Sequence, residues 1–300
     1  MKKRFFLLMA VIIIVSAACS LPAAAAPAPT AAAAAAQTPI PAATDLPATL
    51  PPAPAPTETQ AVPTTEPTAA IGPLFTFSWV KLYIPTAVAA GGLSDVISAV
   101  ANSPDVAPWD IAPMHEQVPL SGYPLANTFH EPRLYIYPVQ DFIALDSAFA
   151  DRVAELQGIL AQRPADPPIV PSLPPWNAGR TFYASPAYVD FQNGSGIRFI
   201  AQYGQAVMPI NNHELFYMFQ GLTADGKYWV AAVLPIQHPS LPSGVGDPFP
   251  ADMDAFIANY DTYRQALRAD LEAQPADSFT PSIQLLDAML STMTVGPTGP

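Results

Sequence analysis

The sequence contains little of the chemistry on which many protein functions depend. Its 300 residues include a single cysteine, Cys19, which excludes an intrachain disulfide and a metal site built from several cysteines. Only 12 Lys and Arg stand against 24 Asp and Glu, so the formal net charge is −12. Because nucleic-acid binding needs a basic surface to neutralise phosphates, we expect no nucleic-acid partner.

Familiar catalytic motifs are also missing. The chain has no Gly-x-Ser-x-Gly segment, which disfavours a serine hydrolase of that type. Beyond residue 3 the only lysines are Lys81 and Lys227, and neither lies in a phosphate-binding loop. These absences favour a non-enzymatic binding or accessory protein over an enzyme, and we expect no cofactor.

Residues 1–18 have the pattern of a secretory signal peptide. Positive charge at residues 2–4 precedes an apolar run over residues 5–15 and the small residues 16–18. The apolar run is shorter than the roughly 20 residues that span a bilayer. The pattern therefore predicts export from the cytoplasm.

Cys19 follows the small residues directly, and this arrangement resembles a bacterial lipobox, although Ser16 stands where that motif prefers leucine. The resemblance implies a lipoprotein with a fatty-acyl (palmitate-type) anchor on Cys19, which would become the mature N-terminus. The chain would then be held on the membrane by its lipid, in the cell envelope and outside the cytoplasm. The alternatives are cleavage within residues 23–26, which would remove Cys19, or an uncut signal anchor.

Residues 19–73 are expected to form a disordered tether. Residues 21–73 contain 19 Ala, 13 Pro and nine Thr, and no aromatic residue, Lys or Arg. Such a segment cannot bury enough apolar surface to offset the loss of chain entropy. We expect an extended linker that holds a folded domain away from the membrane.

Residues 74–300 are predicted to form a single acidic domain, with 21 Asp and Glu against nine Lys and Arg. Alternating or continuous apolar residues predict strands over residues 75–85, 117–123, 133–139, 180–191, 196–203, 214–220 and 227–236. Asn193-Gly194 and Asp225-Gly226 predict tight turns within a four-strand meander. Pro186 predicts a bulge or an edge position in its strand.

Helical patterns occur before, between and after these strands. The sequence predicts helices over residues 92–101, 141–162, 252–273 and 281–293, the last with Thr280 as N-cap and Pro281 in its first turn. The order of elements predicts an α+β fold in which helices pack on both faces of an antiparallel meander sheet.

Three segments carry a resemblance to a family: residues 194–236, HEPRLYIYPVQDF (130–142) and FTPSIQLLDAMLSTMTV (279–295). They resemble segments of uncharacterised bacterial lipoproteins with Pro/Thr-rich tethers, a resemblance that implies no particular activity. The order of elements is more distantly similar to the PsbP-like α/β/α sandwich. That similarity implies an accessory or binding role and no site residues.

Histidine–glutamate pairs suggest a metal-dependent alternative. His115, His130 and His213 are each followed by Glu, and Tyr217 stands where His213-Glu214 would need a second histidine to form His-Glu-x-x-His. If the fold brings His115, His130, His213 and Glu214 together, the protein would be a secreted or anchored metal-dependent hydrolase. Otherwise these side chains bond to nearby polar groups.

Polar residues on otherwise apolar strands are the candidates for ligand binding. They are Arg180, Arg198, Gln202, His213 and Gln220. They would line a groove for a small molecule, a glycan or an envelope protein, with Trp176 among the aromatic residues available to stack on sugars. In the alternative interpretation, Arg198 pairs with Asp190 across a hairpin and holds its register.

Overall fold

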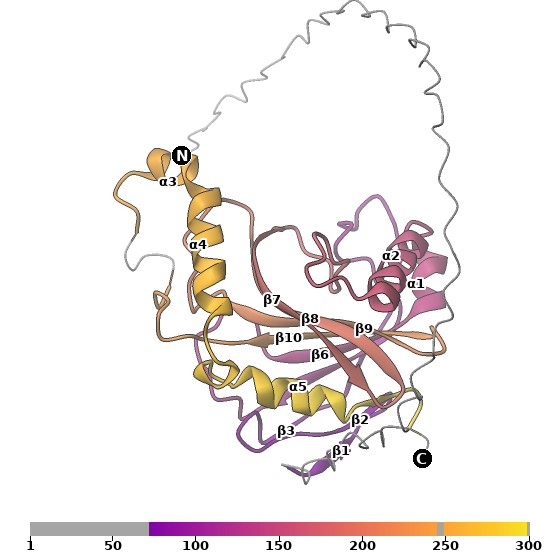
Figure 1. Cartoon of the computed structure of the whole chain (residues 1–300). Coiled ribbons are helices and arrows are strands. Elements are labelled where there is room, and N and C mark those ends of the chain that lie inside the picture. The colour runs from indigo at the N-terminus through magenta and orange to yellow at the C-terminus, as the bar shows by residue number, and fades with distance from the viewer. Residues whose placement is uncertain (1–71, 245–248, 299–300) are drawn as a thin grey trace, which may run out of the picture. The chain divides into compact units, whose positions relative to one another are not determined.

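Helices pack against an antiparallel sheet in the computed structural model, which describes residues 72–244 and 249–298 (Figure 1). The predicted α+β class with antiparallel strands is therefore confirmed. The predicted signal peptide, Cys19 and nearly all of the tether lie outside the described residues. Within the described ranges, no helix has the length and apolar character needed to cross a bilayer.

The main sheet has eight strands in the order β3-β5-β6-β10-β9-β8-β7, with β4 also paired to β5. All of its pairings are antiparallel. Its strands are β3 (Gly91–Gly92), β4 (Asp95–Ile97), β5 (His115–Ser121), β6 (Arg133–Pro138), β7 (Gly179–Phe191), β8 (Gly194–Gly204), β9 (Phe216–Thr223) and β10 (Tyr228–Pro235). The predicted meander is β7 to β10.

A smaller sheet joins the two ends of the described chain. It consists of β1 (Leu74–Thr76), β2 (Val80–Tyr83) and β11 (Thr294–Val295), in the order β1-β2-β11. The last strand is thereby paired with one of the first, and Asn193 secures it by donating from Nδ2 to the Val295 carbonyl at 2.7 Å.

The apolar side chains of the main sheet form two clusters. In β9, Phe216 and Met218 belong to one cluster with residues of α1 (Val139–Leu145) and α2 (Phe149–Gln162). Tyr217 and Phe219 belong to the other, with residues of β2, α4 (Tyr260–Glu272) and α5 (Ile283–Ser291). Successive strand residues point to opposite faces, so the two clusters cover opposite sides of β9.

The helix predicted over residues 92–101 is wrong, because this segment contributes β4 and the end of β3. Val96 and Ile97 are β-branched, and β5 offers an unpaired edge to which β4 bonds. A strand edge that can supply backbone partners outweighs weak helical periodicity.

Two predicted helices are each divided in two. Residues 141–162 form α1 and α2 because Asp146 adopts an extended conformation (φ −140°), and its carboxylate accepts a hydrogen bond from the Ala148 N–H at 3.0 Å. Residues 252–273 form α3 (Met253–Ala258) and α4, separated at Asn259. A short 3-10 turn, η1 (Ala276–Ser278), follows.

The N-cap of the last helix is also corrected, because α5 begins at Ile283 with Ser282 before it. The backbone of Thr280 exchanges two hydrogen bonds with Gln237, both at 2.9 Å. Thr280 is therefore held as an extended bridge and cannot cap the helix.

The turns of the meander differ in type. Gly226 has a φ of +70°, as a turn at Asp225-Gly226 requires. In the β7–β8 hairpin, Phe191 pairs with Gly194, so Gln192 and Asn193 form the loop and not Asn193-Gly194 as predicted.

Glu116 is a buried carboxylate that joins the two sheets. It is fully buried in β5, and its Oε1 accepts from the Ser78 N–H at 2.8 Å and from the Ser94 hydroxyl. Its Oε2 accepts from the Trp79 N–H at 2.7 Å. Ser78 and Trp79 lie between β1 and β2. The Glu116 carboxylate, on β5 of the main sheet, therefore accepts hydrogen bonds from the turn of the smaller sheet.

Replacing Glu116 with alanine should lower the free energy of unfolding by about 2–4 kcal/mol, because two backbone N–H groups lose their acceptors. Urea unfolding followed by circular dichroism measures the change. Glu155→Ala, at an exposed position of α2, is the matched control and should change stability by less than about 0.5 kcal/mol. Equal effects of the two substitutions would contradict this role for Glu116.

Candidate ligand-binding sites

Two of the predicted ligand-binding residues, Gln202 and Gln220, are buried and hold loops in place. The Gln220 amide accepts from the Leu173 N–H (3.0 Å) and from Trp229 Nε1 (2.7 Å), and it donates to the Leu173 carbonyl (2.7 Å). Gln202 accepts from the Asn211 N–H at 3.1 Å. Their polar atoms face other parts of the chain, so neither side chain lines a surface site.

His115 lies apart from the other predicted metal ligands. It is buried in β5, and its ring stacks on Tyr137 with 4.5 Å between ring centroids. Its Nδ1 lies 2.8 Å from the Pro113 carbonyl oxygen, and burial lowers its pKa. Tyr137 is near the end of β6, whereas His130 precedes the first residue of that strand, Arg133. His115 and His130 therefore lie near opposite ends of β6.

His130 forms one wall of a pocket of about 540 Å³, which we call the aromatic pocket. The pocket is lined by Phe129, His130, Trp176, Asn177, Ala178, Tyr203, Gly204, Gln205 and Glu214. The ring centroids of His130 and Trp176 lie 5.0 Å apart, and those of Trp176 and Tyr203 lie 4.8 Å apart. Phe129 is 65% exposed. Sequence reasoning named Trp176 for stacking on sugars but not Phe129 or Tyr203, which the fold brings there from distant segments.

The ionisable groups other than tyrosine that line the aromatic pocket are one imidazole, His130, and one carboxylate, Glu214. Burial lowers the pKa of His130 to about 4, so the imidazole is uncharged at neutral pH. One carboxylate oxygen of Glu214 accepts from Asn211 Nδ2 at 3.2 Å. His213 packs beside Phe129 and its Nδ1 lies 2.5 Å from the Asn127 carbonyl oxygen. Aromatic surfaces with a few amide and carboxylate groups suit an uncharged ligand.

The predicted metal ligands do not form a centre in this structure. Across residues 72–244 and 249–298, no group of three or more His, Cys, Asp or Glu side chains is placed to hold a metal ion. His130 and Glu214 line the aromatic pocket, and His213 lies beside it. The two histidine rings both contact the Phe129 ring, with 5.0 Å and 6.3 Å between ring centroids.

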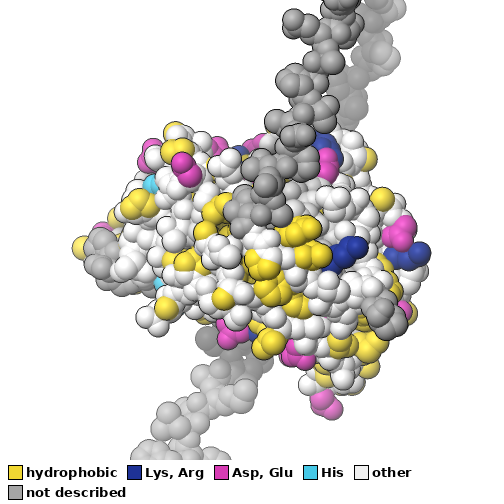
Figure 2. All heavy atoms as spheres, turned by 90° about the horizontal axis from the view of Figure 1, so that it is seen from below, with side chains coloured by type: hydrophobic (Ala, Val, Ile, Leu, Met, Phe, Trp, Pro, Cys, Tyr) yellow, Lys and Arg dark blue, Asp and Glu magenta, His cyan; other side chains and the backbone are white. Residues whose placement is uncertain are grey.

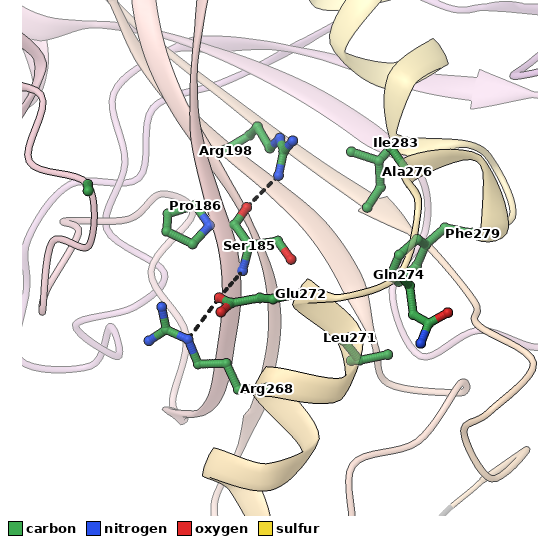
Figure 3. Close-up of a pocket in the computed structure, with 11 residues that line it drawn as sticks. Ser185, Pro186, Arg198, Arg268, Leu271, Glu272, Gln274, Ala276, Phe279 and Ile283 are labelled. Carbon is green, nitrogen blue, oxygen red and sulfur yellow. Dashed lines mark hydrogen bonds and ion pairs between the residues drawn. The ribbon is translucent and has the colours of Figure 1, made fainter.

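Arg198 belongs to a junction formed where β7 bulges (Figure 3). The β7–β8 register shifts between Ala184 and Ala187, which confirms the bulge predicted at Pro186. Arg198 Nε and Nη2 each lie 3.2 Å from a carboxylate oxygen of Asp287 on α5, and Nη1 donates to the Ser185 carbonyl. The predicted pairing of Arg198 with Asp190 is wrong: Asp190 pairs with Arg163, because α5 supplies Arg198 with a nearer carboxylate.

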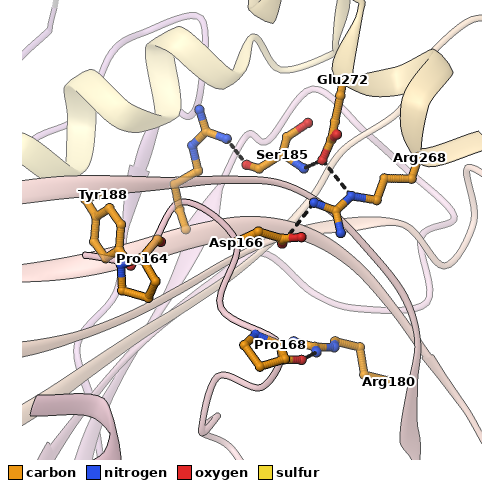
Figure 4. Close-up of polar contacts among 9 residues, drawn as sticks. Pro164, Asp166, Pro168, Arg180, Ser185, Tyr188, Arg268 and Glu272 are labelled. Carbon is orange, nitrogen blue, oxygen red and sulfur yellow. Dashed lines mark hydrogen bonds and ion pairs between the residues drawn. The ribbon is translucent and has the colours of Figure 1, made fainter. Parts of the chain in front are cut away.

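Ser185 occupies the left-handed region in this bulge, with a φ of +52°. Its N–H donates to Glu272 Oε1 at 2.8 Å, and Glu272 also accepts from Arg268 Nε at 2.8 Å (Figure 4). Arg198 of β8 thus bonds to the Ser185 carbonyl, and Glu272 of α4 bonds to its N–H. These two contacts stabilise a left-handed backbone conformation that costs a residue other than glycine about 1–2 kcal/mol. A pocket of about 400 Å³ adjoins the junction, but Arg198 and Arg268 are both already paired with carboxylates.

Arg180 lies in β7 and lines a third pocket, of about 290 Å³, to which Arg268 also contributes. Its Nη2 donates to the Pro168 carbonyl at 2.6 Å (Figure 4). Of the five predicted ligand-binding residues, Arg180 and Arg198 line pockets, and His213 adjoins one.

Comparison of the chain with known protein families, curated proteins and solved structures finds no match.

The depressed pKa of His130 predicts an acid-dependent loss of stability. Above pH 6.5 the imidazole is neutral in both the folded and the unfolded chain, so it contributes nothing. Between pH 6.5 and about 4 the unfolded chain binds the proton first, which should lower the free energy of unfolding by up to about 3 kcal/mol.

This contribution is measured by comparing the wild-type chain with His130→Gln, which stays neutral at every pH. Urea unfolding at pH 7, 5.5 and 4 should show a shallower loss of stability in the variant. If both proteins lose stability in parallel, His130 is not the group responsible.

Proposed function

We propose that this protein is a lipid-anchored, non-enzymatic binding or accessory domain of the cell envelope, and that its ligand occupies the aromatic pocket. The observation that carries the proposal is the pocket itself, in which Phe129, Trp176 and Tyr203 meet around a neutral His130. Its volume of about 540 Å³ lies in the range typical of small-molecule sites.

A glycan is the ligand class that these side chains favour. Sugar rings have apolar faces that stack on aromatic rings and hydroxyl groups that need hydrogen-bond partners at their edges. Trp176 and Tyr203 offer the rings, and their planes meet at 75°. Asn177, Gln205 and Glu214 offer amide and carboxylate groups around them.

The location rests on the N-terminal segment. A signal-peptide pattern followed by Cys19 supports lipid attachment, and the Ala/Pro/Thr-rich segment supports a long tether. For the folded part we propose a PsbP-like sandwich with helices on both faces of the sheet, an architecture consistent with an accessory role beside an envelope protein.

Replacing Trp176 with alanine should weaken glycan binding at least tenfold, because it removes the largest stacking surface of the pocket. Neutral oligosaccharides of glucose or N-acetylglucosamine are the probes, and isothermal titration calorimetry gives the affinity. Wild-type tryptophan fluorescence should also shift on binding.

Trp109→Ala is the matched control, since Trp109 is 41% exposed and does not line the pocket. It should bind as the wild type does. If no neutral oligosaccharide binds, or if both variants bind equally well, the aromatic pocket is not a glycan site.

Replacing Cys19 with alanine should move the protein from the membrane fraction to the soluble extracytoplasmic fraction, because the acceptor for the lipid is lost. Fractionation followed by immunoblotting measures the distribution, and Ser20→Ala is the control that should stay on the membrane. Retention of the Cys19→Ala protein on the membrane would refute lipidation.

A further inference from the structure

Positive charge is scarce in this domain, yet three arginines line one small pocket. Residues 74–300 contain nine Lys and Arg, and Figure 2 shows few of them on the face it presents. Arg180, Arg264 and Arg268 all line the pocket of about 290 Å³, which we call the arginine pocket. Asp166 is the one carboxylate among its lining residues. Three of the nine cationic residues of this domain therefore line one pocket.

Arg180 is the centre of this pocket. Its guanidinium is half-buried and lies 4.3 Å from the centre of the Tyr183 ring and 5.7 Å from that of Phe199. Among the described residues no Asp or Glu forms an ion pair with it, and its Nε and Nη1 donate to no acceptor. Burial, with the charge of Arg268 nearby, lowers the pKa of Arg180.

The two arginines of α4 line the same pocket, and both are paired with carboxylates. Arg264 and Arg268 are four residues apart on the same helix, a spacing at which like charges repel. Arg264 pairs with Asp261, whose side chain is 77% exposed, and such surface pairs contribute little. Arg268 bonds to Asp166 and to Glu272 through Nη2 and Nε, and its Nη1 has no acceptor within the described part of the chain.

We propose that the arginine pocket binds a small oxyanion, either a phosphate or a carboxylate group of a ligand. A guanidinium presents its donors in a planar fork that matches these anions, and partial burial strengthens the interaction. Arg180 supplies the donors that have no acceptor among the described residues. Arg264 and Arg268 line the same pocket and are held there by their ion pairs. This site is separate from the aromatic pocket and does not rest on the function proposed there.

The test titrates the full chain with inorganic phosphate and, separately, with succinate, at pH 7 and at an ionic strength matched with sodium chloride. Isothermal titration calorimetry should show saturable binding to one site. Tighter binding of phosphate assigns a phosphate-bearing ligand, and tighter binding of succinate assigns a carboxylate-bearing one.

Arg180→Gln should weaken binding at least tenfold, and Arg264→Gln about threefold. Arg264 has a 46% exposed side chain, so its variant is expected to fold even if Arg180→Gln does not. Arg152→Gln is the control, because Arg152 is an exposed residue of α2 and does not line the arginine pocket. It removes the same charge and should leave binding unchanged.

The proposal is overturned if neither anion binds above the chloride background, or if Arg264→Gln and Arg152→Gln bind alike. Trp176→Ala should bind phosphate as the wild type does, because Trp176 lines the aromatic pocket and not the arginine pocket. The variant therefore separates a failure of the glycan proposal from a failure of the oxyanion proposal.

Discussion

Strand β9 is buried along its whole length, and the rest of the domain depends on that burial. Its two faces are both apolar, so each needs cover: residues of α1 and α2 pack with Phe216 and Met218, and residues of β2, α4 and α5 with Tyr217 and Phe219. The hydrophobic effect thereby fixes where the helices lie. Phe216 also contacts His130 and Trp176, so the aromatic pocket is an extension of this core to the surface.

Polar groups inside the core hold the long loops. Gln220 of β9 bonds to both backbone groups of Leu173, and Glu116 of β5 satisfies the turn between β1 and β2. Each of these side chains forms hydrogen bonds with backbone groups that the fold shields from water. Gln220 thereby holds the proline-rich loop that carries Trp176 of the aromatic pocket.

Much of the fold could be predicted from the sequence, because strand patterns are local. The alternation in β7 to β10 and the Asp225-Gly226 turn were sufficient to predict the meander. The breaks at Asp146 and Asn259 could not be predicted in the same way, since the apolar spacing continues across both positions. Of the candidate sites, the residues Arg180, Arg198, His130 and Glu214 were named from sequence, but the pockets to which they belong were not.

The sequence by itself determined the antiparallel meander, the scarcity of positive charge and the expectation of an exported, tethered domain, because these depend on composition and short-range pattern. Only the tertiary structure decided which charges are paired. Arg198 meets Asp287, 89 residues away, and not Asp190 on the neighbouring strand, which Arg163 takes. Arg180 forms no ion pair with a carboxylate of the described residues. Such pairings follow from how α4 and α5 pack on β7 and β8, and side-chain contacts between distant segments leave no periodic signal in the chain.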